Sequence, residues 1–169
     1  MKRPLLALLF IVPSLGAAAM QPRGASVPPV VDAIHLDKSD HRLTVYNDGK
    51  AVRTFIVALG RGGLRPKERQ GDGRVPEGSY RITGRNPNSA FHLSLRIGYP
   101  TPAQIAQAQK LGIRPGNHIM IHGLPNGWKW LGKRHRQRDW TEGCIAVTNE
   151  EMDWLWAAVP IGTPIEIVQ

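Results

Sequence analysis

Cys144 is the only cysteine in the 169-residue chain, and it lies in a short segment whose residue types suit nucleophilic chemistry. The segment runs from Thr141 to Asn149, and Gly143 leads directly into the thiol. Because a free thiol titrates near pH ~8.5 and only the thiolate attacks, this nucleophile needs a base. His122, in the upstream Ile-His-Gly, is the candidate base. A turn at Gly143 would expose the thiol and let the backbone N–H groups of Gly143 and Cys144 stabilise an oxyanion.

The two segments together resemble the catalytic motif of the L,D-transpeptidase (YkuD-like) family. The shared pattern is an Ile-His-Gly, a Ser/Thr-x-Gly-Cys-hydrophobic segment, a helix and a closing Gly-Thr-Pro-Ile-Glu-Ile strand, and it covers residues 31–169. The resemblance implies that Cys144 forms a thioester and that His122 acts as general base and acid. It also implies that the main-chain carbonyl of Gly123 orients His122 and that Thr141 supports the turn. No cofactor and no metal are implied.

The resemblance also implies a substrate, the stem peptide of peptidoglycan. The donor would be a tetrapeptide, attacked at the L-centre carbonyl of its diamino acid, before a terminal D-Ala. The acceptor would be the amine of a second stem, a lysine of a wall-linked protein, or water. We therefore interpret the chain as an exported cysteine acyl-transferase, an L,D-transpeptidase. A hydrolase, carboxypeptidase or amidase of the same fold is the alternative. It would form the same acyl-enzyme and differ only in that water, rather than an amine, attacks the thioester.

The chain departs from the commonest family pattern at three points. Glu142 stands where many members have His, and Ala146 stands where many have Arg or Asn. Eighteen residues separate His122 from Thr141, which is slightly longer than usual and fits a larger lid. We therefore expect altered pH behaviour, and we expect substrate carboxylates to be recognised from elsewhere, within residues 129–138.

Residues 124–140 combine tryptophans with basic side chains. Two interpretations are open: a solvated basic loop with partly buried indoles, or a lid or groove wall over the nucleophile that binds glycan or peptide carboxylates. The position of this segment between the two halves of the motif supports the second interpretation. The candidate substrate-binding residues are Trp128, Lys129, Trp130, Arg134, Arg136, Arg138 and Trp140.

Other functions compete with the acyl-transferase. A non-catalytic wall-binding module would use the basic, Trp-bearing surface and would be indifferent to a Cys144→Ala change. An ordinary thiol protease would cleave unfolded proteins and leave wall peptides untouched. A metal site built from His118 and His122 is disfavoured, because the isoleucines between them favour a strand, on which four residues span roughly 13 Å.

The first residues predict export. A basic start at Lys2 and Arg3, an apolar run over 5–15 and three alanines ending at Ala19 indicate a signal peptide over 1–19. The alternative, a membrane anchor, needs about 20 apolar residues, so we expect no integral membrane segment after cleavage. A Pro-rich linker over 20–30 and one catalytic domain over 31–169 follow. The net charge of +9 suits anionic cell-wall polymer, and export argues against nucleic acid. The expected location is the periplasm or the cell wall.

Short alternating segments predict a mainly β domain, sandwich-like or barrel-like, with two short helices. The helices are expected over 103–111 and, after the capping box of Thr148 and Glu151, up to Ala158. Residues 60–78 and 85–89 are expected to be loops. The expected strands lie at 33–36, 42–46, 51–59, 79–82, 91–97, 118–122, 145–147 and 163–168.

Overall fold

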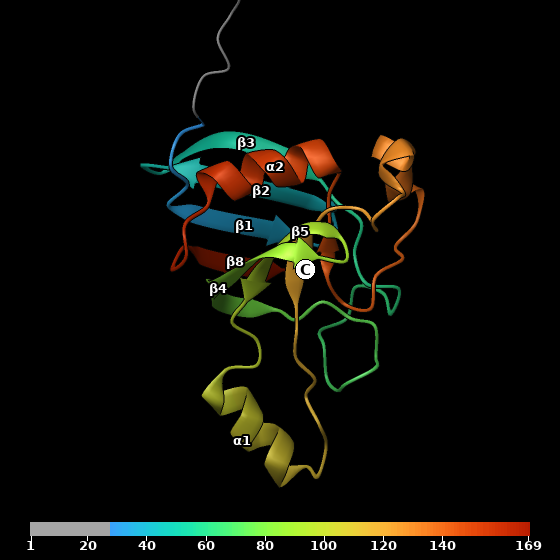
Figure 1. Cartoon of the computed structure of the whole chain (residues 1–169). Coiled ribbons are helices and arrows are strands. Elements are labelled where there is room, and N and C mark those ends of the chain that lie inside the picture. The colour runs from blue at the N-terminus through green and yellow to red at the C-terminus, as the bar shows by residue number, and fades with distance from the viewer. Residues whose placement is uncertain (1–27) are drawn as a thin grey trace, which may run out of the picture.

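One curled sheet of eight strands organises the fold (Figure 1). The computed structural model describes residues 28–169, so the predicted signal peptide and residues 20–27 of the predicted linker lie outside it. The strands are β1 Ala33–Asp37, β2 Arg42–Asn47, β3 Lys50–Ile56, β4 Gly78–Ser89, β5 His92–Ile97, β6 Met120–His122, β7 Ile145–Ala146 and β8 Pro164–Val168.

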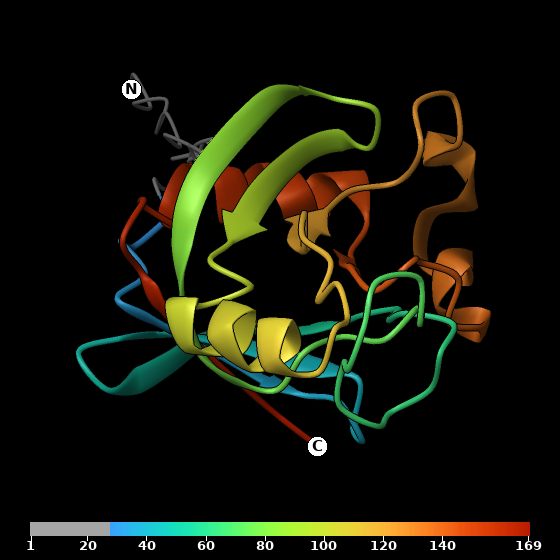
Figure 2. The ribbon, with the colours of Figure 1, turned by 90° about the horizontal axis from the view of Figure 1, so that it is seen from below.

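The strand order is β3-β2-β1-β8-β4-β5-β6-β7. The pairs β1/β8 and β6/β7 are parallel, and the other neighbours are antiparallel. The long strand β4 takes part in both halves: its first residues pair with β8 and its later residues pair with β5. The register shifts between Ile82 and Gly84, where an irregularity increases local bending. The sheet therefore curls at β4, as the view from below shows (Figure 2).

Within residues 28–169, three helices accompany the sheet: α1 Pro102–Lys110, the 3-10 helix η1 Lys129–Gln137, and α2 Asn149–Ala158. Both α-helices begin with a capping box, formed by Thr101 with Gln104 and by Thr148 with Glu151. In each box the threonine side chain accepts a backbone N–H that the first turn leaves unpaired. The predicted mainly β fold and its two short helices are confirmed, whereas η1 was not predicted.

Helix α2 lies against β5 and fills the space within the curl of the sheet (Figure 1). Its residues Met152, Leu155 and Ala158 are buried in the main core. The β4–β5 hairpin is tied to the same helix, because the Arg85 guanidinium donates to the Trp156 carbonyl at 2.6 Å and stacks over the Trp156 ring. Strand β8 pairs with both β1 and β4, and helix α2 packs against β5, so these two elements join the two halves of the sheet.

Several element boundaries differ from the sequence expectations. Residues 85–89 were expected to form a loop, but they extend β4, because the hairpin with β5 offers them pairing partners despite Pro87. The expected strand over 118–122 is shorter, since His118 has a positive φ of 60° and the ladder begins only at Met120. The strand expected over 51–59 ends at Ile56, and Ala58 instead bridges to Ala146.

Candidate active site

Cys144 and His122 line one cavity of about 530 Å³. His122 is the last residue of β6, and Cys144 directly precedes the neighbouring parallel strand β7, in which Ala146 pairs with His122. The parallel pairing therefore brings the two predicted catalytic side chains to the same end of the sheet. The cavity is also lined by Asn86, Ser89, Ala90, Phe91, His118, Met120, Trp140, Thr141 and Glu142.

The imidazole of His122 is oriented by its neighbour along the chain. Its Nδ1 lies 2.7 Å from the Gly123 carbonyl oxygen, and because a carbonyl only accepts, Nδ1 carries the proton. The unprotonated Nε2 is then the basic nitrogen. Burial lowers the pKa of His122 to about 4, against a weaker opposing effect of the Gly123 hydrogen bond. The ring is therefore neutral at neutral pH and able to accept a proton.

The Cys144 thiol is partly exposed to this cavity and is protonated at rest. Its S–H donates to the His118 carbonyl oxygen at 3.4 Å. Burial raises the pKa of Cys144, although a backbone hydrogen bond from Met120 and, more weakly, the charge of Lys67 act in the opposite direction. A neutral thiol and a neutral imidazole in one cavity suit a nucleophile that forms when a base removes its proton, rather than a stable thiolate.

Thr141 closes the turn that carries the nucleophile. Its hydroxyl donates to the Cys144 carbonyl at 2.7 Å and accepts the Gly143 N–H at 3.2 Å. The N–H of Gly143, expected to help hold an oxyanion, thus has a partner inside the turn. The N–H of Cys144 makes no hydrogen bond within residues 28–169, which leaves it as the better candidate donor.

The segment before β4 supports the nucleophile turn from behind. Ala58 exchanges two backbone hydrogen bonds with Ala146, at 3.0 and 2.8 Å, and the Arg61 N–H donates to the Thr141 carbonyl. Gly143 has a φ of +115°, and a Cβ placed there would lie 2.6 Å from the Arg74 carbonyl oxygen. Residue 143 must therefore be glycine both for its backbone conformation and for its packing.

Asn149 is a supporting residue that sequence reasoning missed. Its side-chain oxygen accepts the Leu124 N–H at 2.8 Å and would lie 2.8 Å from a Cβ on Gly123. The first residue of α2 thus holds the backbone just after His122. In the sequence Asn149 was named only as the last residue of the cysteine segment, with no role assigned, and its partner is 25 residues away.

The family model described as YkuD, the L,D-transpeptidase catalytic domain, matches residues 31–167. The chain belongs to the YkuD family. The putative L,D-transpeptidase YafK of Escherichia coli K12 is 24% identical over 94% of the chain, and the chain spans only 63% of the length of that relative. Similar solved structures include the helical cell shape determining protein Pgp2 from Campylobacter jejuni, with a TM-score of 0.61 and 23% identity, covering 82% of this chain and 48% of that one.

A second solved structure, the L,D-transpeptidase from Xylanimonas cellulosilytica, has a TM-score of 0.54 and 19% identity, and the match covers 87% of this chain and 63% of that one. At these identities the likeness to solved structures shows the fold.

Aromatic side chains join the cavity of Cys144 and His122 in this YkuD-family chain to residues 124–140. The His122 ring packs with Phe91, at 4.5 Å between centroids, and with Trp140, at 5.8 Å, and the Phe91 and Trp140 rings are themselves 6.2 Å apart. Trp140 in turn donates its indole N–H to His135 at 3.4 Å. His135 is buried, and burial, reinforced by Arg136, lowers its pKa to about 4. His135 was not predicted, since nothing in its basic surroundings distinguished it.

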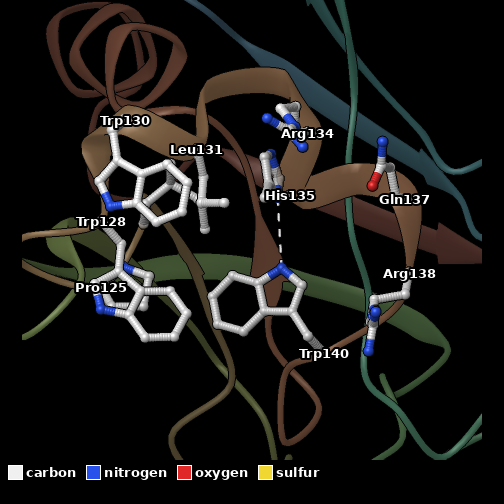
Figure 3. A pocket seen from close by; sticks show the side chains of 10 residues that line it. Pro125, Trp128, Trp130, Leu131, Arg134, His135, Gln137, Arg138 and Trp140 are labelled. Atoms are coloured by element: carbon white, nitrogen blue, oxygen red, sulfur yellow. Dashed lines mark hydrogen bonds between the residues drawn. The ribbon is translucent and has the colours of Figure 1, made fainter.

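The predicted substrate-binding residues separate into two groups. Figure 3 shows Trp128 and Trp130 on one side of Trp140, with Arg138 on the other, around a second cavity of about 400 Å³ that Arg134 also lines. Trp140 lines this cavity as well as the catalytic one. Lys129 and Arg136 do not line either cavity: Lys129 pairs with Glu150 at 3.5 Å, and Arg136 pairs with the capping residue Glu151. Binding of substrate by any of these residues stays a prediction.

Two further findings concern ions and membranes. Within residues 28–169, no three His, Cys, Asp or Glu side chains gather closely enough to hold a metal ion. In the same part of the chain, no helix is both long and apolar enough to cross a membrane.

Proposed function

We propose that this YkuD-family chain is an exported L,D-transpeptidase that transfers peptidoglycan stem peptides through a Cys144 thioester. The observation that carries the proposal is the shared cavity of Cys144 and His122, with the His122 Nδ1 proton held by the Gly123 carbonyl. That arrangement leaves a neutral imidazole with Nε2 as the base, in the cavity into which the thiol opens. A transpeptidase would act in the periplasm or at the cell wall.

In the first half-reaction, His122 takes the thiol proton as Sγ of Cys144 attacks the L-centre carbonyl of the diamino acid. The carbonyl oxygen becomes an oxyanion, which the Cys144 N–H faces as a candidate donor. One such donor is worth about 3 kcal/mol of barrier. The intermediate collapses to the thioester when the C–N bond breaks, and His122 returns its proton to the departing D-Ala amine.

In the second half-reaction, an amine acceptor attacks the thioester carbonyl and gives a proton to His122. The C–S bond then breaks, the proton passes to the thiolate, and the cross-linked peptide leaves. Water in place of the amine gives hydrolysis by the same steps. The amine is proposed to come from a second stem peptide or from a lysine of a wall-linked protein.

Intact-mass spectrometry of the protein mixed with disaccharide-tetrapeptide tests this function, with Cys144→Ala as the matched variant. The expected result is an adduct on the wild type with loss of D-Ala, followed by cross-linked dimer, and no adduct on Cys144→Ala. An adduct that decays only to free tripeptide would identify a hydrolase instead. A folded wild type that forms neither adduct nor product would refute the donor assignment, and wall binding unchanged in Cys144→Ala would favour the binding module.

A further inference from the structure

The cavity around Cys144 opens onto one face of the β4–β5–β6 sheet. Asn86 of β4 pairs with Ser94 of β5, and Ser94 pairs with His122 of β6. Directly paired residues present their side chains to the same face, so these three form a row that ends at the predicted base. Arg96 lies two residues further along β5, in the next row on that face, where it pairs with Met120.

A third, smaller cavity of about 180 Å³ lies on this face. It shares Asn86 and Met120 with the catalytic cavity, so the two spaces are neighbours. Its ionisable lining residues are Arg85 and Arg96, and no acidic side chain lines it among the described residues. The Arg85 guanidinium is already bound to carbonyl groups of Trp156 and Val159. Arg96 therefore sets the charge that this cavity offers to a ligand.

Two side chains in the smaller cavity have unused hydrogen-bonding capacity. Ser94 is 1% exposed, and its Oγ has no hydrogen-bond partner within residues 28–169. A buried hydroxyl without a partner is costly, so a group that enters the cavity and bonds to Ser94 would be favoured. The exposed Arg96 side chain has no ion pair or hydrogen bond in the same part of the chain, and the contact with the Thr83 hydroxyl involves the Arg96 backbone carbonyl.

Gly84 keeps the space beside Arg96 open. It pairs with Arg96, and a Cβ built on it would meet the Arg96 Cβ at 3.8 Å, an ordinary contact. Its φ is not positive, so the backbone does not require glycine here. A larger side chain at residue 84 can therefore be introduced without backbone strain, and it would fill the cavity.

We propose that Arg96, with Ser94 beside it, binds a carboxylate of the peptide whose carbonyl Cys144 attacks. This inference rests on the proposed function, and it names a specificity-determining site for it. The guanidinium supplies the charge and the paired N–H donors that suit a carboxylate, and the Ser94 hydroxyl supplies a further donor.

The spacing of the strands limits which carboxylate fits. Arg96 and His122 are diagonal neighbours on adjacent strands. The Cα atoms of such a pair of residues lie roughly 7–8 Å apart. A peptide advances at most ~3.6 Å per residue. The bound carboxylate is therefore within two or three residues of the attacked carbonyl, either on the leaving D-Ala or on a residue next to the diamino acid.

Steady-state kinetics on synthetic stem tetrapeptides tests the site, with each carboxylate amidated in turn. For Arg96→Gln we expect KM to rise roughly ten- to hundred-fold, the usual loss for a hydrogen bond to a charged group, with kcat unchanged. Amidation of the recognised carboxylate should raise the KM of the wild type by the same factor. It should not raise the KM of Arg96→Gln any further. Arg96→Lys should recover part of the loss, and Gly84→Leu should raise KM by filling the space.

Arg42→Gln is the matched control, since Arg42 is an exposed arginine on the distant strand β2. Binding of the same peptides to Cys144→Ala by calorimetry separates this site from the proposed reaction. If the wild type forms no adduct yet Arg96→Gln weakens carboxylate-dependent binding, the function fails and the site stands. The site is overturned if Arg96→Gln binds and reacts like Arg42→Gln with every peptide. It is also overturned if the affinity lost in Arg96→Gln is the same whichever carboxylate of the peptide is amidated.

Discussion

At the residue scale, the proposed catalytic pair is a neutral thiol and a neutral imidazole that line one cavity. Burial raises the pKa of Cys144, and burial lowers the pKa of His122 to about 4. Both shifts act against a stable thiolate–imidazolium pair, because each charged form is desolvated in the cavity. This state differs from that of enzymes whose nucleophilic thiol is already ionised near pH 7, and it places the proton transfer within the acylation step.

Alkylation of Cys144 by iodoacetamide should therefore follow an ordinary or raised thiol pKa. We expect the rate to rise with pH through a midpoint above ~8.5, with no plateau of reactive thiolate near neutral pH. His122→Gln should reduce acylation by stem peptide about 10²- to 10⁴-fold, the usual contribution of a general base, while the alkylation midpoint moves little. A wild-type midpoint below pH 7 that disappears in His122→Gln would instead indicate a resting ion pair.

Gly143 should not tolerate a side chain. In Gly143→Ala the new Cβ meets the Arg74 carbonyl at 2.6 Å, and the φ of +115° is unfavourable for alanine. We expect a loss of about 2–4 kcal/mol in the free energy of unfolding, from strain and overpacking together. Acylation should also fall more than the stability loss explains, since Cys144 moves with the turn. Urea denaturation and adduct formation measure the two effects.

Gly127→Ala is the control for this change. Gly127 also has a positive φ, of +87°, but nothing lies within 4 Å of a Cβ placed there. In Gly127→Ala the free energy of unfolding should fall by roughly 1–2 kcal/mol, because alanine is strained at this positive φ. The acylation rate should stay unchanged. Equal losses in the two variants would show that the contact with Arg74 has no consequence.

At the element scale, the loop 60–74 is a rigid support rather than a flexible connection. Its centre is Asp72, whose carboxylate accepts the backbone N–H groups of Glu68, Arg69 and Arg74 and pairs with Lys67 at 2.7 Å. Despite partial burial, these hydrogen bonds lower the pKa of Asp72 to about 2. The Arg74 backbone packs against Gly143. The hydrogen bonds of this loop therefore also help to hold the turn before Cys144 in place.

Asp72→Ala should therefore destabilise the protein and slow acylation. Lys67 and Asp72 are 3% and 7% exposed, and removing one partner of a buried pair costs about 3–5 kcal/mol. Glu150→Ala, which breaks the exposed pair with Lys129, should cost less than about 1 kcal/mol. Thermal unfolding and adduct formation compare the variants. A stable Asp72→Ala protein with normal acylation would show that the turn does not depend on the loop.

The sequence allowed the local parts of this fold to be predicted. The two α-helices carry their caps within four residues, and the hairpin of β2 and β3 has its turn signal at Asp48 and Gly49, so near neighbours determine them. The loop of Asp72 was expected as an ordinary surface loop, because its role comes from contact with Gly143, about 70 residues away. Residues 85–89 were misjudged for the same reason, since their strand character depends on pairing with β5.

The candidate site divides in the same way. Cys144 and His122 could be selected from residue types and a known motif. Asn149, His135 and Arg96 could not, because each is defined by a partner or a cavity that only the folded sheet creates. The order of residue types in a motif predicts chemistry better than it predicts which distant side chains surround that chemistry.

At the scale of the whole molecule, buried neutral histidines link the fold to pH. Burial lowers the pKa of both His122 and His135 to about 4, whereas an unfolded histidine titrates near ~6.5. Between these values the unfolded chain binds protons that the folded chain excludes, so the free energy of unfolding falls as the pH falls. Asp72 and Glu151, whose pKa values are lowered, act in a lower window, since their contribution is lost only below their ordinary values near 4.

We expect stability to decline between pH 6.5 and 4.5 and to level off for the histidines near pH 4. His122 alone accounts for a loss on the order of 3 kcal/mol, because one pKa unit corresponds to about 1.4 kcal/mol. Urea denaturation at half-unit pH steps measures the slope, and the double variant His122→Gln, His135→Gln should flatten it. His35→Gln, at a partly exposed histidine of β1, is the control. An unchanged slope in the double variant would place the acid sensitivity on the carboxylates.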